Sequence, residues 1–389
     1  MRKGNHVLVF ILAVGVFGIL NTEMGVIGIL PAIADHFHIS IAKAGWLVSL
    51  FALVVAGAGP TMPLLFSGVD RKKVMLLVLG VFVLGNVVSI FTSSFTVLLL
   101  ARIIPAFFHP VYCSLAFSVA AASVSKAEAP KAVARVFVGV SAGMVAGVPI
   151  ASFIASAVSL QAAMAFFAVV NIIVFLATWA AVPSMPVTER LSYGSQFSVL
   201  KKSLTWLSIL TVILLNAAIF GVYSYLADYL KTVTHMPASL ASFALFVYGG
   251  ANIIGNMVGG RLLSANANKF VAAFPFVLVG LYTLLFLFGQ YSLPMLAITF
   301  IWGILGGIGG NINQYWVTSA ASEAPDFANG LFISACNVGT TLGAAAGGLL
   351  VSGLGTGYVV FLGILAAVLG WVTIRVRNNM YSPVKQLSA

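Results

Sequence analysis

The stretch GVSAGMVAGVPIAS, residues 139–152, carries a glycine at every fourth position of a long apolar run. A second ladder with the same spacing occurs 200 residues later. The two ladders are Gly139, Gly143 and Gly147, and Gly339, Gly343 and Gly347. Glycine at every fourth residue lines one helix face and lets a neighbouring backbone approach closely. We interpret the shared offset as an internal repeat; the alternative is chance, because glycine supplies 38 of 389 residues.

Apolar runs of membrane length extend in both directions from these ladders. The chain is 61% hydrophobic, with a mean hydropathy of +1.10, which excludes an ordinary soluble protein. A helix needs about 20 apolar residues to cross a bilayer, and these runs are too long for barrel strands. The sequence therefore predicts an all-α integral membrane protein with twelve transmembrane helices. They are expected near 7–30, 43–66, 74–93, 96–122, 133–157, 160–182, 204–230, 238–263, 269–289, 292–318, 328–352 and 355–376.

The longest polar interruption, PSMPVTERLSYGSQFSVLKKS at 183–203, divides these runs into six and six. Two prolines and a glycine are typical of a connecting loop. We therefore expect an N-terminal six-helix bundle at 1–182, a cytoplasmic connector at 183–203 and a C-terminal six-helix bundle at 204–389. Two repeated, pseudo-symmetric bundles imply alternating access to a site between them.

The basic residues report topology rather than nucleic-acid binding. The net charge is +11, yet most of the 19 Lys and Arg residues fall on the side of the N-terminus. Only Lys43 and Lys231 fall in loops on the opposite side. This distribution follows the positive-inside rule and places both termini in the cytoplasm. We expect a multi-pass protein of a bacterial cytoplasmic (inner) membrane.

Two charges lie inside the apolar runs. Glu23 belongs to the first and Arg102 to the fourth. An ionised side chain at the bilayer centre costs roughly 2.5–3.5 kcal/mol on insertion scales, so it usually faces a polar cavity. Counted along the helices at 1.5 Å per residue, both lie roughly 10 Å below the same membrane surface. The two side chains are therefore expected at a similar depth.

Three segments resemble a known family of membrane proteins. Residues 139–152, with Gly139, Gly143, Gly147 and Pro149, resemble the glycine-rich motif of the drug:proton antiporter branch of the major facilitator superfamily. NTEMGVIGILPAIADHF, residues 21–37, is similar to the first span of its subgroup that exports sugars, purine nucleosides or drugs. LLLARIIPAFFHPVYCSLA, residues 98–116, matches that subgroup's arginine, followed by a histidine seven residues later.

The resemblance implies the major facilitator fold, with spans 1 and 4 lining the cavity, and export rather than import. The loop FSGVDRKKVM, residues 66–75, keeps the family's basic cluster at Arg71 but lacks its leading glycine. A structural or gating role for Asp70 and Arg71 is what the resemblance implies there. Pro105 or Ala106 stands where the family's fourth span usually has glycine.

Proton coupling is the expected role of the buried charges. Burial and a neighbouring arginine act oppositely on a carboxylate's proton affinity, so moving Arg102 relative to Glu23 would switch it. The alternative is a static ion pair that joins spans 1 and 4. His109 lies two turns after Arg102 and could relay a proton or contact solute. Alternatively, it is a neutral, hydrogen-bonded histidine beside two prolines.

Polar and aromatic residues at helical spacing in the second half are candidates for solute binding. Amides and aromatic faces suit a neutral, hydroxyl-bearing or ring-containing solute. The alternative is that the amides pack between helices. The candidates are Tyr223, Tyr248, Asn252, Asn256, Trp302, Asn311 and Asn337. Tyr223 and Trp302 stand 200 residues after Glu23 and Arg102, so the two halves have diverged.

We predict a proton-coupled secondary transporter, an antiporter that exports a small neutral or amphipathic solute such as a drug, sugar or nucleoside. A proton-coupled importer or a uniporter is the alternative, followed by a channel. The sequence carries no motif of an enzyme, and we expect no cofactor and no metal. The expected partners are solute, protons and lipid, without nucleic acid, and the chain is expected to act as a monomer.

Overall fold

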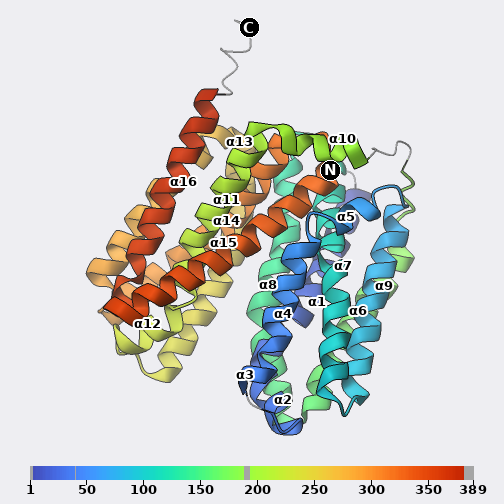
Figure 1. The fold of residues 1–389 in the computed structure, drawn as a ribbon, viewed down its shortest axis with the longest axis horizontal. Coiled ribbons are helices and arrows are strands. Elements are labelled where there is room, and N and C mark those ends of the chain that lie inside the picture. The colour runs from blue at the N-terminus through green and yellow to red at the C-terminus, as the bar shows by residue number, and fades with distance from the viewer. Residues whose placement is uncertain (1–2, 40, 188–192, 381–389) are drawn as a thin grey trace, which may run out of the picture. The chain divides into compact units, whose positions relative to one another are not determined.

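The computed structural model describes residues 3–39, 41–187 and 193–380, and these residues form helices and turns without a strand. The chain divides into two compact units, Met1–Tyr193 and Gly194–Ala389 (Figure 1). Of the basic residues expected on the cytoplasmic side, Arg2, Arg190 and Lys385 lie outside the described residues. The predicted all-α fold is confirmed.

The first unit contains long helices joined by short turns. Its elements are α1 (Lys3–Gly25), the 3₁₀ turn η1 (Val26–Ile29), α2 (Leu30–His36), α3 (Ile41–Ala44), α4 (Trp46–Ala58), α5 (Met62–Leu65), α6 (Arg71–Phe91), α7 (Phe95–Ala122), α8 (Ala129–Ala157) and α9 (Leu160–Ala181). Within this unit α1 packs against α8, α9 and α7, so the first span lies at its centre.

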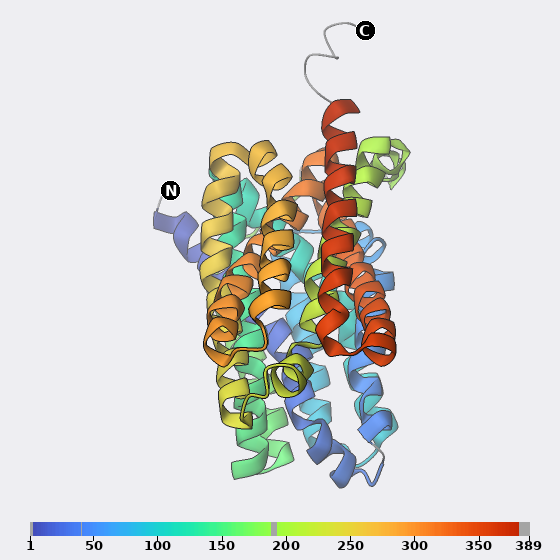
Figure 2. The same ribbon diagram turned by 90° about the vertical axis from the view of Figure 1, so that its left-hand side faces the viewer.

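The second unit repeats this pattern. Its elements are α10 (Tyr193–Phe197), η2 (Ser198–Lys201), α11 (Ser203–Tyr223), α12 (Leu226–Thr232), α13 (Ala238–Phe288), α14 (Ser292–Ala320), α15 (Pro325–Leu354), η3 (Thr356–Val359) and α16 (Val360–Met380). Helix α10 and η2 thus occupy part of the predicted connector. Helix α16 packs along α11 and α13, as the side view in Figure 2 shows.

Two predicted spans are the two helical parts of α13, which meet at a kink. Ten helices of the described residues are long and apolar enough to cross a membrane, and Trp46–Ala58 is a shorter apolar helix. Element α13 covers 51 residues and consists of two helices joined across a kink, each long enough for one crossing at about 1.5 Å per residue. Its backbone leaves helical geometry only at Asn266, whose Oδ1 accepts a hydrogen bond from the Lys269 backbone N–H. The predicted loop near 264–268 is therefore a capped kink.

Three other spans are interrupted. The first span changes from α-helix to 3₁₀ helix after Gly25, and the seventh breaks after Tyr223. Gly25 and Tyr223 lie 198 residues apart, so the two breaks match the 200-residue offset of the repeat to within two residues. The second span breaks between Ala58 and Met62, where Pro60 has no backbone N–H to continue the helix.

The glycine ladders lie at close helix contacts in both units. A Cβ at Gly139 would lie 2.8 Å from the carbonyl carbon of Ala13, on α1. A Cβ at Gly339 would lie 2.5 Å from the carbonyl oxygen of Ile213, on α11. Ladder and partner both carry the 200-residue offset, so the same packing recurs in each unit and supports the predicted pseudo-symmetry.

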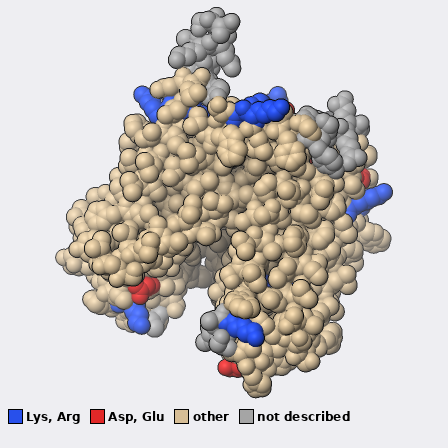
Figure 3. All heavy atoms as spheres, viewed as in Figure 1, with Lys and Arg blue, Asp and Glu red and all other residues tan. Residues whose placement is uncertain are grey.

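The surface suits an apolar surrounding. On the face in Figure 3, charged side chains are sparse and most of the surface is uncharged. Large apolar side chains such as Phe10, Phe91 and Leu293 are more than 60% exposed. Such exposure is expected where lipid replaces water around the helices.

Candidate functional site

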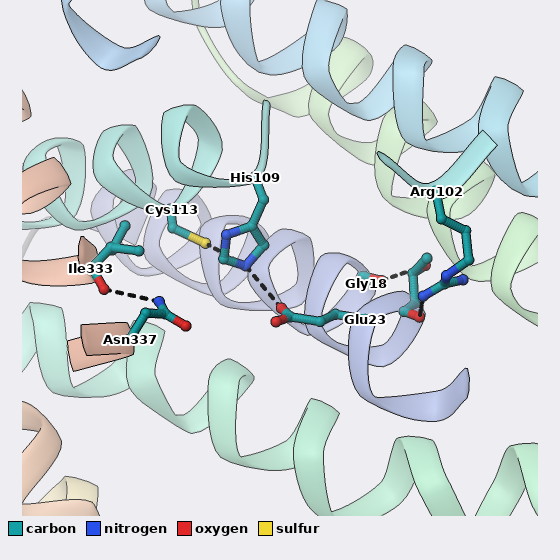
Figure 4. Close-up of polar contacts among 8 residues, drawn as sticks. Gly18, Glu23, Arg102, His109, Cys113, Ile333 and Asn337 are labelled. Carbon is teal, nitrogen blue, oxygen red and sulfur yellow. Dashed lines mark hydrogen bonds and ion pairs between the residues drawn. The ribbon is translucent and has the colours of Figure 1, made fainter. Parts of the chain in front are cut away.

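Glu23 contacts His109 in the interior of the first unit. Glu23 lies two residues before the end of α1, and its Oε2 is 3.1 Å from Nε2 of His109 on α7 (Figure 4). Their side chains are only 12% and 8% exposed. The Cys113 Sγ, one turn further along α7, lies 3.8 Å from the same histidine nitrogen. The structure therefore pairs Glu23 with a histidine.

Arg102 is nearly buried but does not form an ion pair with Glu23. Its Nη2 donates a hydrogen bond to the backbone carbonyl of Thr22, at 2.7 Å. The last four carbonyls of a helix lack partners within that helix, and the carbonyl of Thr22 is one of these because α1 ends at Gly25. A cation is also favourable at a helix C-terminus. Arg102 therefore caps the end of α1, beside Glu23.

Phe51 of α4 closes one side of this cluster. Its ring packs edge-on against the His109 imidazole, at 6.0 Å between centroids, and lies 5.9 Å from Cζ of Arg102. An apolar wall strengthens electrostatic interactions because it excludes water. The carboxylate and imidazole can share a proton as a coupled pair, and the guanidinium keeps a positive charge nearby.

The aromatic candidates of the second unit form one cluster. The rings of Tyr223 and Tyr248 stack at 4.4 Å between centroids, and Trp302 packs edge-on against both. Trp302 is fully buried and also packs against Tyr282, whereas Tyr223 is partly exposed. Tyr223 therefore forms the accessible side of the cluster, and the buried Tyr248 and Trp302 lie behind it.

The amide candidates bond mainly to one another and to the backbone. Asn311 Nδ2 on α14 donates to Asn256 Oδ1 on α13 at 2.8 Å, and Asn256 Nδ2 lies 3.3 Å from Asn252 Oδ1. Asn337 Nδ2 donates to the Ile333 carbonyl of its own helix, at 2.9 Å (Figure 4). These contacts join α13 to α14, as the alternative interpretation of the amides expects.

The motif candidates lie at helix contacts. Asp70 is the N-cap of α6: its Oδ1 accepts from the Lys73 backbone N–H at 3.1 Å, and its Oδ2 accepts from the Ser184 hydroxyl at 2.6 Å. The Arg71 backbone N–H donates to the carbonyl of Met185. Pro149 lies inside α8, next to Val148, whose carbonyl oxygen packs against Gly28 of η1. Asp70 and Arg71 thus tie the start of α6 to the chain after α9.

Replacing Asp70 with Ala is expected to lower stability by about 1 kcal/mol, the usual cost of losing an N-cap. Asp70→Asn keeps the cap and serves as the matched control. Burial acts to raise the pKa of Asp70, but hydrogen bonds from Ser184 and from backbone N–H groups outweigh it, so the pKa lies below 3.8. The charged form therefore adds stability above that pH, and this contribution fades as pH falls through the lowered pKa.

Thermal denaturation at pH 7 and near pH 3 measures this difference. The gap between wild type and Asp70→Ala should narrow in acid. A gap of the same size at both pH values would show that the carboxylate charge contributes nothing to the cap.

Sequence reasoning missed the residues that surround Thr22. Asn86 on α6 and Asn171 on α9 both donate to the Thr22 hydroxyl, at 3.2 and 2.8 Å. The contacts of Phe51 and Cys113 with His109 were also missed. A usable signal was present, because Asn86 and Asn171 are isolated amides in otherwise apolar spans, and such amides need partners.

Known proteins are similar to this chain over nearly its whole length. A sequence profile described as the Major Facilitator Superfamily matches residues 12–326. The chain is 30% identical over 357 residues to the "Inner membrane transport protein YdhP" of Escherichia coli (strain K12), covering 92% of each. It is 27% identical over 377 residues to the "Probable sugar efflux transporter" of Helicobacter pylori (strain ATCC 700392 / 26695), covering 95% of this chain and 96% of that one.

The fold is also found among solved structures. The crystal structure of the Major Facilitator Superfamily transporter FucP in the outward conformation superposes with a TM-score of 0.77 at 15% identity. The match covers 97% of this chain and 99% of that chain. At this identity the likeness shows the shared twelve-helix fold.

Proposed function

The chain belongs to the Major Facilitator Superfamily and moves small solutes across a membrane, and from that premise we propose that it is a proton-coupled antiporter. It exports a small neutral or amphipathic solute by alternating access, in exchange for protons that enter. The observation that carries this proposal is the Glu23–His109 contact, because a buried carboxylate and imidazole 3.1 Å apart form a proton-binding pair.

Arg102 supplies the fixed positive charge beside this pair. Its guanidinium caps α1 at Thr22, so motion of α7 relative to α1 changes the distance between Arg102 and Glu23. A cation closer to the carboxylate favours loss of its proton, and a more distant cation favours uptake. Alternating access then couples the proton to the solute.

A hydroxyl-bearing ring is the solute class that the second unit favours. Tyr223 offers a partly exposed ring that is stacked on Tyr248, with Trp302 behind, and sugar rings pack their apolar faces on such rings. Asn252, which is half-buried and lies one turn from Tyr248 on α13, supplies hydrogen bonds beside this surface. The relative named a sugar efflux transporter supports both the solute class and export.

We further propose a membrane, an orientation and an oligomeric state for the chain. The chain acts as a monomer. It lies in a bacterial inner membrane, which the name of the relative YdhP, an inner membrane transport protein, supports. Both termini lie in the cytoplasm, on the side where basic residues predominate. On that side, two hydrogen bonds act in gating: Asp70 accepts from Ser184, and the Arg71 backbone N–H donates to Met185.

Reconstituted liposomes with an imposed pH difference test this function. A panel of labelled sugars and nucleosides is offered outside, and an antiporter accumulates its solute when the interior is the acid side. With one proton exchanged per solute, a difference of about one pH unit supports roughly tenfold accumulation. Liposomes without protein and liposomes with equal pH are the controls.

The sign of the pH difference separates the alternatives. Accumulation only when the exterior is acid would identify a proton-coupled importer. Equilibration at the same rate with and without a pH difference would identify a uniporter, and either result would reject the antiporter.

A further inference from the structure

A saturated hydroxyl lies at the turn of α1 that carries Glu23. The Thr22 hydroxyl donates to the Gly18 carbonyl at 3.1 Å and accepts from Nδ2 of Asn86 and of Asn171. One donated and two accepted bonds are the full capacity of a hydroxyl. The side chains of Thr22, Asn86 and Asn171 are at most 4% exposed, so water does not replace these bonds.

The three donors to Thr22 come from three helices. Asn86 lies on α6 and Asn171 on α9, and both reach the hydroxyl, while Arg102 on α7 reaches the carbonyl of the same residue. Asn171 Nδ2 is also within 3.2 Å of the carbonyls of Gly18 and Phe167. One residue of α1 is therefore fixed from three sides.

This fixation matters because α1 ends three residues later, at Gly25. Successive helix residues are rotated by about 100°, so a small turn of this last segment would carry Glu23 away from α7. We propose that Asn86 and Asn171 are positioning residues, which hold Thr22 so that the adjacent Glu23 carboxylate stays against His109. The meaning of this role for transport rests on the proton-coupled function proposed above.

The surroundings of Glu23 contain few other ionisable groups. In the first unit, α4, η1 and α9 pack against α1 and carry no ionisable side chain. The ionisable groups near Glu23 belong to α7. Apart from Glu23 itself, the ionisable groups of α1, α6 and α8 lie in the first two turns of each helix. The first set is Arg102, His109, Tyr112 and Cys113; the second is Lys3, His6, Arg71, Lys72, Lys73, Lys131 and Arg135. The titration of His109 therefore reports chiefly on its neighbours along α7 and on the position of Glu23.

The test is a nitrogen NMR titration of the full chain, labelled at its five histidines. The His109 signal is identified by its loss in His109→Gln. A carboxylate within about 4–6 Å shifts a titration by one to three units, so Glu23→Gln is expected to move the His109 midpoint by about one pH unit. Thr22→Val and Asn171→Ala should move it to the Glu23→Gln value, and Asn86→Ala part of the way.

Two variants are expected to keep the wild-type midpoint. Thr22→Ser retains the hydroxyl, and Asn311→Ala removes a comparable buried amide between α13 and α14. A wild-type midpoint in folded Thr22→Val and Asn171→Ala would overturn the proposal. If those two variants do not fold, Asn86→Ala, which removes one bond to Thr22, decides in the same way.

The titration does not depend on transport. A wild-type protein that ignores the imposed pH difference would reject the antiporter function, while the His109 midpoints would still decide the positioning role. Conversely, proton-driven transport with unchanged midpoints in all variants of Thr22, Asn86 and Asn171 would reject the positioning role alone.

Discussion

Liposomes containing Glu23→Gln are expected to leave the solute at equal concentration on both sides of an imposed pH difference, where the wild type concentrates it. Glutamine keeps the size of the side chain but cannot bind or release a proton. His109 alone cannot return the proton to a carboxylate, so the coupled pair is lost. The wild-type ratio of roughly tenfold per pH unit should therefore fall to about one.

Exchange of labelled solute across the membrane without any gradient distinguishes uncoupling from misfolding. Glu23→Gln should retain this exchange, because the aromatic surface of the second unit is unchanged. The matched control is Glu128→Gln, which makes the same chemical change at the residue before α8 and should behave like wild type. Accumulation by Glu23→Gln to the wild-type ratio would exclude Glu23 as the coupling carboxylate.

The sequence located the buried charges, but it did not reveal their contacts. The depth of Glu23 and Arg102 follows from counting residues along two apolar runs. Depth does not give rotation about the helix axis, and it does not reveal that α1 ends at Gly25. Arg102 bonds to the Thr22 carbonyl because that end leaves the carbonyl available, and His109 then contacts the carboxylate.

The helix breaks were similarly hidden from the sequence. The run from Val7 to Leu30 is apolar apart from Asn21, Thr22 and Glu23, so hydropathy treats it as one span. The change to a 3₁₀ turn at Val26 accompanies the close packing of Gly25 and Gly28 against α8. This is a tertiary contact, and it has no local signature. By contrast, Pro60 marks the break of the second span in the sequence itself.

The repeat was the most informative sequence feature because its cause is steric. A glycine face indicates a close helix neighbour but not which helix that is. The structure identifies the neighbour as α1 for the first ladder and α11 for the second, each at the same offset. The amides of α13, Asn252 and Asn256, were harder to interpret. An asparagine in an apolar helix can hydrogen-bond either to another amide or to a solute, and the structure shows the first case for Asn256.

Gly139→Ala is expected to be among the most destabilising single changes in the first unit. Its added methyl group would lie 2.8 Å from the Ala13 carbonyl carbon and still closer to the oxygen. Both atoms belong to the backbone of α1, so relief requires the helices to separate rather than a side chain to rotate. Overpacking of this kind typically costs 1–3 kcal/mol, occasionally more.

The matched control is Gly280→Ala in α13, where an added Cβ meets nothing within 4 Å. Alanine is the better helix former by about 1 kcal/mol, so this variant should be as stable as wild type or more so. Thermal denaturation in one detergent should therefore separate the two alanine variants in opposite directions. Equal shifts would mean that composition, rather than close packing on α1, explains the ladder.

If the repeat is structural, Gly339→Ala should behave as Gly139→Ala does, because its Cβ would lie 2.5 Å from the Ile213 carbonyl oxygen.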